Sequence, residues 1–145
     1  MHAVIFDLDK TVFTGDATLY NDVDSLLGIL RRLGVKVGAL TSGDHRMLVR
    51  LEEAGIRHHF DDVVCSAHFT DPKALAGVEH LLNRMQVEPQ DTAFVSHLDD
   101  DMVLGKRAGL AKTIRVVHGP VRTGRVVIDA DYVIEDIATV LDVLE

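Results

Sequence analysis

The sequence has too few cysteines for the disulfide bonds that stabilise small secreted folds, and it has no segment long and apolar enough to span a membrane. One cysteine, Cys65, three prolines and no tryptophan occur among its 145 residues. A single cysteine excludes an internal disulfide and fits a reducing compartment, so a cytoplasmic location is expected. No apolar run approaches the roughly 20 residues of a membrane helix, and the first ten residues do not resemble a signal peptide. No membrane association is therefore predicted.

Positive charge is also scarce. Lysine and arginine total 15 against 23 aspartates and glutamates, which leaves a formal net charge of −8. A chain of this charge repels phosphate backbones, so nucleic acid is not an expected partner. Hydrophobic residues make up 47% of the chain, enough for a core without disulfides at this length. One domain over residues 1–145 is the expected organisation.

What the chain does have is a regular alternation of short apolar runs and amphipathic stretches. Strands are predicted at residues 2–9, 35–40, 61–66, 91–96 and 113–117. Helices are predicted between them, beginning at Asn21, at Asp44, at Asp71-Pro72 and at Asp99, and residues 131–144 predict a last strand and helix. The first helix is expected to bury Val23, Leu26, Leu27, Leu30 and Leu33. This order predicts an α/β, Rossmann-like three-layer sandwich with a mainly parallel sheet of five strands or slightly more.

Polar residues follow several of these strands, at the sheet edge where ligands bind in such folds. Asp7 and Asp9 end the first strand and are two residues apart, so an extended chain points both to one side. Two close carboxylates repel each other unless a proton or cation intervenes. Mg²⁺ suits them because it takes hard oxygen ligands and bridges to phosphate. Thr41-Ser42 follows the second strand and Ser96-His97 the fourth.

These residues have a consistent chemistry. A carboxylate can attack phosphorus to form an aspartyl-phosphate, while a second carboxylate protonates the leaving group and then activates water. Thr41 offers a hydroxyl and Lys73 a positive charge to a phosphoryl group, and phosphoryl transfer needs little more than positioning and neutralisation. Each part alone has a simpler interpretation, as a turn former, a helix cap or a solvated lysine. The order and spacing of the parts together are more specific.

Four segments resemble the motifs of the haloacid dehalogenase-like (HAD) superfamily of phosphohydrolases. VIFDLDKTV is similar to the first motif, DxDxT, and VGALTSG to the second, an apolar strand that ends in Thr or Ser. Lys73 in DPKAL resembles the third motif, and FVSHLDDDM resembles the fourth, GDxxxD. The resemblance implies that Asp7 is the nucleophile and Asp9 the acid/base, and that Thr41, Ser42 and Lys73 bind the phosphoryl group. It also implies that Asp7, the Asp9 carbonyl and Asp101 serve a Mg²⁺ ion.

One position departs from the family pattern. His97 stands where the family has the first Asp of GDxxxD, while Asp101 matches the second. Imidazole is a softer ligand and carries no negative charge, so Mg²⁺ affinity should fall or the preference should move toward Mn²⁺. The alternative is that His97 has left the metal site. Two functions stay open: a Mg²⁺-dependent phosphatase, or a catalytically impaired HAD-like protein used for binding or regulation.

A third hypothesis is a phosphoacceptor domain of the receiver type. Such domains also have early paired acids, a Thr and a Lys, but their acceptor Asp ends the third strand. Here the third predicted strand ends in Cys65-Ser66, which ranks this hypothesis last.

The spacing of the motifs leaves no room for a cap. Neither the interval from Thr11 to Thr41 nor that from Thr41 to Lys73 can hold an inserted domain of about 50 residues or more. A capless protein with an open site is expected. The resemblance then implies a phosphorylated protein or small molecule as partner, with a homo-oligomer as a further way to cover the site. A basic cluster, which comprises Arg115, His118, Arg122 and Arg125, is either a contact for such partners or a solvated loop.

Overall fold

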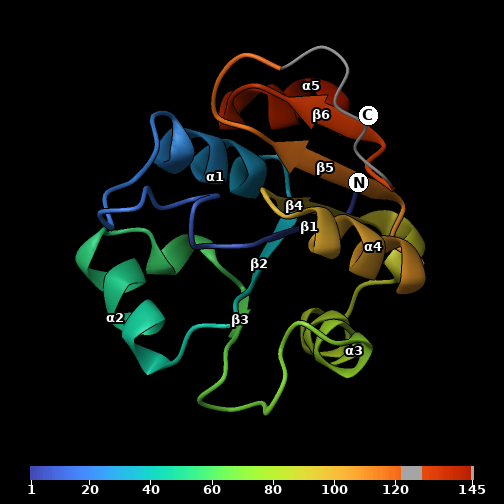
Figure 1. Ribbon diagram of the computed structural model, residues 1–145. Helices are drawn as coiled ribbons and strands as arrows, with labels where there is room; N and C mark the ends of the chain where they lie inside the picture. Colours follow the sequence, from blue (N-terminus) through green and yellow to red (C-terminus); the bar gives the residue numbers. More distant parts are fainter. Residues whose placement is uncertain (122–128, 145) are drawn as a thin grey trace.

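The computed structural model describes residues 1–121 and 129–144. Its strands form one sheet in the order β3-β2-β1-β4-β5-β6, in which all neighbours are parallel (Figure 1). The strands are β1 (Ala3–Phe6), β2 (Lys36–Leu40), β3 (Asp62–Val64), β4 (Thr92–Ser96), β5 (Lys112–Val116) and β6 (Tyr132–Ile134). The helices are α1 (Val23–Arg32), α2 (His45–Glu53), α3 (Leu75–Met85), α4 (Asp99–Arg107) and α5 (Val140–Val143). The predicted parallel α/β fold is confirmed, and β6 is the additional strand.

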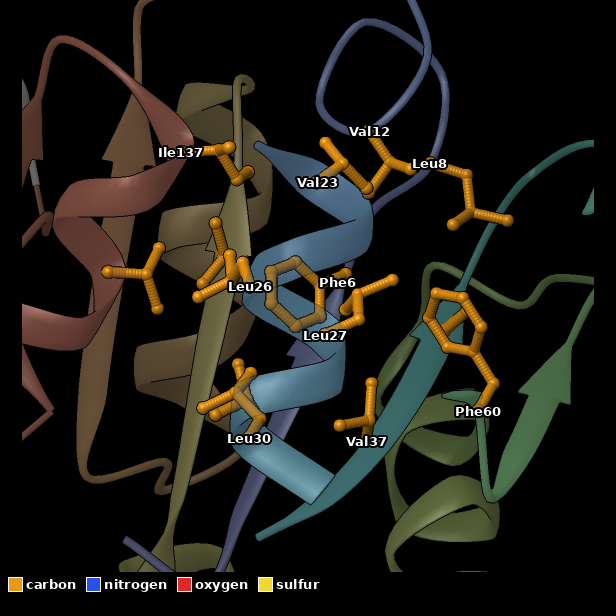
Figure 2. Close-up of a cluster of buried hydrophobic side chains, with 14 of the residues drawn as sticks. Phe6, Leu8, Val12, Val23, Leu26, Leu27, Leu30, Val37, Phe60 and Ile137 are labelled. Carbon is orange, nitrogen blue, oxygen red and sulfur yellow. The ribbon is translucent and has the colours of Figure 1, made fainter. Parts of the chain in front are cut away.

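Helices cover both faces of the sheet and complete the three layers (Figure 1). Val4 and Phe6 of β1 belong to the apolar cluster with α1, α2 and α5, whereas Ala3 and Ile5 belong to the cluster with α3 and α4. This division follows from the alternation of side chains along a strand. Figure 2 shows leucines of α1 against Phe6 and Val37 of the sheet. Both faces are buried, as a parallel sheet requires.

The strand order decides against the receiver type. In that fold the first strand lies between the second and the third. Here β1 lies between β2 and β4, so the receiver hypothesis is wrong. No cap domain is inserted among residues 11–73, all of which the structure describes. Within the described residues, no helix is long and apolar enough to span a membrane.

Two predicted details of the early helices have different outcomes. Asp44 caps α2, because its side chain accepts a hydrogen bond from the Arg46 backbone N–H. Helix α1 begins at Val23 after Asp22, which has φ 70° and makes no side-chain cap, so the predicted cap at Asn21 is one residue early. Leu33 is 68% exposed, so its predicted burial is wrong. It lies just past the last helical turn, where Gly34 adopts φ 78° and turns the chain toward β2.

The start of α3 is also displaced from the prediction. The helix begins at Leu75, three residues after Pro72, and residues 72–74 form a turn. This turn folds onto the helix so closely that a Cβ at Gly77 would lie 2.0 Å from the Pro72 carbonyl oxygen. Only glycine permits this approach, and the turn carries Lys73 into the sheet edge.

We expect Gly77→Ala to destabilise the protein by about 1–3 kcal/mol, although alanine is the better helix former. The added methyl group must displace the Pro72 carbonyl, and with it Lys73. Urea unfolding would measure the loss of stability. Gly15→Ala is the control, because a Cβ at Gly15 meets nothing within 4 Å. Equal stability of the two variants would contradict the expectation.

Candidate active site

The sheet register brings the predicted site residues together. Phe6 pairs with Ala39 of β2 and Val95 of β4, so the residues that follow these three leave the sheet at one edge. There an open cleft of about 690 Å³ lies over the carboxyl ends of the strands. Six of the predicted site residues line it, namely Asp7, Asp9, Thr41, Ser42, Lys73 and His97. The seventh, Asp101, is buried and contacts Lys73. The predicted convergence is confirmed, whereas the chemical roles stay predictions.

Asp7 is held as an ionised carboxylate by three neighbours. It is only 3% exposed. Its Oδ1 accepts from Lys73 Nζ at 2.9 Å, and its Oδ2 accepts from the Thr11 hydroxyl at 2.9 Å and lies 3.1 Å from His97 Nδ1. Burial raises the pKa of Asp7, but the hydrogen bond with His97 and the charge and hydrogen bond of Lys73 outweigh it, so the pKa lies below its usual value. Asp7 is therefore ionised at neutral pH, as a nucleophile must be.

Lys73 joins two buried carboxylates. Its side chain is 13% exposed, and its ammonium group lies 2.9 Å from Asp7 and 2.6 Å from Asp101. Burial lowers the pKa of Lys73, but the two carboxylates raise it more, so the lysine is charged. Asp101 also accepts from the Ser96 hydroxyl at 2.7 Å, and burial raises its pKa despite Lys73. One ammonium group thus pairs with two buried carboxylates.

Thr41 has a hydroxyl that is ready to donate. The side chain is 2% exposed, and its Oγ1 accepts from the Gly43 backbone N–H at 3.1 Å. Since that bond uses a lone pair, the hydroxyl proton is left for another acceptor in the cleft. Ser66 stabilises the loop after Thr41, because its N–H and its hydroxyl both donate to the Gly43 carbonyl.

His97 contacts the nucleophile directly. Its Nδ1 lies 3.1 Å from both Asp7 Oδ2 and Thr11 Oγ1, and its backbone N–H donates to Thr11 Oγ1 at 3.0 Å. An ionised carboxylate only accepts, so the contact with Asp7 requires the proton on Nδ1. A nitrogen that donates to Asp7 is not a metal ligand.

The residues assigned to Mg²⁺ by resemblance fit that ion poorly. Mg²⁺ prefers hard oxygen ligands in near-octahedral geometry, but His97 supplies nitrogen, and Asp101 is engaged by Lys73 and Ser96. In the part of the chain that the structure describes, no group of three or more His, Cys, Asp and Glu side chains could hold a metal ion.

The structure gives Thr11, Ser96 and Arg115 contacts that the sequence did not predict. Arg115 belongs to β5, is 8% exposed, and donates to the His97 carbonyl at 3.2 Å while pairing with Asp99 at 3.0 Å. The prediction of a basic surface loop is therefore wrong for Arg115, because this residue lies inside β5 and within the strand predicted at residues 113–117. A lone charge within the apolar run TIRVV was the available signal.

The other members of the predicted basic cluster differ. His118 is half-buried, stacks on the Tyr20 ring with centroids 3.4 Å apart, and its Nε2 donates to the Thr11 carbonyl at 3.0 Å. It thus supports the loop after β1. Arg122 and Arg125 lie outside the described residues.

We expect Arg115→Met to lower kcat/KM for phosphate release by about tenfold and to destabilise the protein by about 1–3 kcal/mol. The loop that presents His97 and the first turn of α4 would lose its buried anchor. Steady-state kinetics and urea unfolding would test this. Arg84→Met is the matched control, because Arg84 pairs with Asp62 at a largely exposed position and such pairs contribute little. An activity equal to that of the control would contradict a positioning role.

Comparison with known proteins agrees with the motifs. Residues 4–109 match the family of haloacid dehalogenase-like hydrolases. The chain belongs to this family. Over 107 residues it is 36% identical to a glyceraldehyde 3-phosphate phosphatase of Methanopyrus kandleri. The aligned region covers 69% of this chain and 44% of that protein. Over 130 residues it is 28% identical to a phosphoglycolate phosphatase of Chromobacterium violaceum. Here the aligned region covers 88% of this chain and 57% of that protein. The HAD chain thus spans about half the length of these curated relatives.

Solved structures show the same fold. A HAD phosphatase from Thermococcus onnurineus superposes with a TM-score of 0.90 at 18% identity, over 99% of this chain and 98% of that one. A putative beta-phosphoglucomutase from Thermotoga maritima superposes with a TM-score of 0.81 at 17% identity, over 98% and 99%. At such identities the likeness establishes the HAD fold and says nothing further about the reaction.

Proposed function

We propose that the protein hydrolyses phosphate monoesters through a phosphorylated Asp7. The observation that carries the proposal is a buried, ionised carboxylate that lines an open cleft and lies 2.9 Å from the ammonium group of Lys73, whose side chain is 13% exposed. Membership of a hydrolase family and two relatives named as phosphatases support it.

In the first step, an Asp7 oxygen attacks phosphorus and the bond to the leaving oxygen breaks. Asp9, which is exposed on the same cleft, gives its proton to that oxygen. In the second step, Asp9 takes a proton from water, the water oxygen attacks the phosphorus of the aspartyl-phosphate, and inorganic phosphate leaves. Asp7 and Asp9 thereby return to their starting states.

Lys73 and Thr41 serve both steps. Lys73 offsets the charge of Asp7 and of the incoming phosphoryl oxygens, which lowers the cost of bringing two anions together. The hydroxyl proton of Thr41 and the backbone N–H of Ser42 would hold a phosphoryl oxygen, since both residues line the cleft. A small phosphorylated molecule is the proposed substrate. A phosphorylated protein, a homo-oligomer that covers the site and a cytoplasmic location stay predictions.

Dependence on Mg²⁺, or on Mn²⁺, also stays a prediction. A bound divalent ion would supply additional charge neutralisation at the phosphoryl oxygens. His97 works against it, because its contact with Asp7 Oδ2 replaces a carboxylate that would face the cation.

The same contact favours a second candidate, a HAD-like protein that binds phosphorylated ligands without turning them over. In that case the hydrogen bond from His97 to Asp7 Oδ2 would weaken Asp7 as a nucleophile. The two candidates differ in whether phosphate is released.

Phosphate release from an aryl phosphate and from a panel of small phosphate esters tests the proposal. The protein and its His97→Asp variant would each be assayed with Mg²⁺, with Mn²⁺ and with chelator. We expect release by the unmodified protein, and its loss in chelator would establish the metal dependence. Release by His97→Asp alone would establish the second candidate. No release by either protein from any ester would overturn the proposed phosphatase.

A further inference from the structure

The cleft carries more positive charge than phosphoryl transfer uses. Besides Lys73, it is lined by Lys10, Arg46 and Arg50, although the chain as a whole has a net charge of −8. Arg46 pairs with Asp44 at 3.0 Å. Among residues 1–121 and 129–144, neither Lys10 nor Arg50 has an ion-pair or side-chain hydrogen-bond partner. The described structure therefore leaves two cations on the cleft wall without an ion-pair partner.

These cations are placed beside the proposed phosphoryl site. Arg46 and Arg50 are four residues apart on α2, so they share one side of that helix, and Met47, which also lines the cleft, is buried next to them. Helix α2 follows directly after Thr41, Ser42 and Gly43. Lys10 follows Asp9 with φ 59° and is exposed on the same cleft. A substrate whose phosphoryl group contacts Asp7 would thus lie with its other end along α2.

We propose that Lys10, Arg46 and Arg50 bind a second anionic group of the substrate. The substrate class is then a small phosphate monoester that carries a carboxylate or a second phosphate at its other end. This inference rests on the proposed phosphatase function and adds the chemistry of the leaving group. The cleft volume of about 690 Å³ lies in the range of small-molecule sites.

Arginine can bind a second anionic group specifically, and not only attract anions by its charge. Its planar guanidinium group binds carboxylate or phosphate through two parallel hydrogen bonds. Arg50 is free to do so, whereas the guanidinium group of Arg46 is shared with Asp44. Arg50 is therefore the residue whose loss should change substrate preference most.

Matched substrate pairs test the inference. 3-Phosphoglycerate and glycerol 3-phosphate differ by a carboxylate, and the bisphosphate and monophosphate of propane-1,3-diol differ by a phosphate. For at least one pair, we expect kcat/KM to be about tenfold or more higher for the substrate with the second anion. Arg50→Met should reduce that ratio by about tenfold, mainly through KM, since the arginine contacts only the distal group. Arg32→Met, at an exposed position of α1 outside the cleft, should leave the ratio unchanged.

The outcomes separate the inference from the function on which it rests. A preference in the first pair assigns the site to carboxylate, and a preference in the second assigns it to phosphate. Equal kcat/KM within both pairs, or a ratio that Arg50→Met does not alter, overturns the inference while the phosphatase function stands. No release from any substrate overturns the phosphatase function itself. Calorimetric binding of phosphonoacetate and ethylphosphonate would then decide, and equal affinities would overturn the second-anion site as well.

Discussion

Asp7→Asn is expected to lower the rate of phosphate release by about three orders of magnitude or more, the scale seen when a catalytic nucleophile is removed. Asparagine has nearly the same shape as aspartate, but its amide is a very weak nucleophile toward phosphorus. The remaining contacts of Lys73 with Asp101 keep the lysine paired, so the fold should persist. Steady-state phosphate release with the best substrate of the panel measures the effect.

Asp100→Asn is the matched control, because Asp100 is an exposed acid at the start of α4 and should have no role in the reaction. Its rate should equal that of the unmodified protein, and both variants should unfold cooperatively. If Asp7→Asn kept more than about a tenth of the activity, Asp7 would not be the nucleophile, given the size of such losses.

Lys73→Met is expected to cost about 3–5 kcal/mol of unfolding free energy at pH 7 and to abolish phosphate release. Removing one partner of a buried ion pair leaves an uncompensated charge, and here Lys73 serves two carboxylates that are each 3% exposed. Urea unfolding measures the loss. Lys106→Met, which removes a more exposed pair with Asp131, should cost about 1 kcal/mol or less.

The loss in Lys73→Met should depend on pH in a definite direction. Burial already raises the pKa of Asp101 with Lys73 present, and without the lysine the folded-state pKa of Asp7 and Asp101 should rise above the unfolded value. The folded variant then binds more protons than the unfolded chain, so its stability increases as pH falls. The deficit should be smaller at pH 5 than at pH 7. Asp101→Asn in the Lys73→Met background should recover part of it, and absence of both effects would show that the carboxylates are not the cause.

The alternation of short apolar runs with amphipathic helical stretches was sufficient to predict the parallel three-layer fold. Apolar runs and amphipathic stretches report which side of each segment is buried, and that local information determines fold class. The meeting of Asp7, Thr41 and His97 also followed from the sequence, because parallel strands share one carboxyl edge. The cap formed by Asp44 was also predictable, because its hydrogen bond is local and reaches a backbone N–H only two residues away.

The tertiary structure alone decided features that depend on partners distant in the chain. Lys73 bridges Asp7 and Asp101, and His97 reaches Asp7 across 90 residues. Arg115 is buried because β5 brings it under the His97 carbonyl, and α3 begins late because the Pro72 carbonyl lies against Gly77. These contacts arise from close packing between segments that are far apart in the sequence. The spacing of apolar residues within a segment does not predict which distant segment it contacts. The sequence by itself therefore determined the fold class and the position of the cleft, while packing decided which charges pair within it and left Lys10 and Arg50 without partners in the described structure.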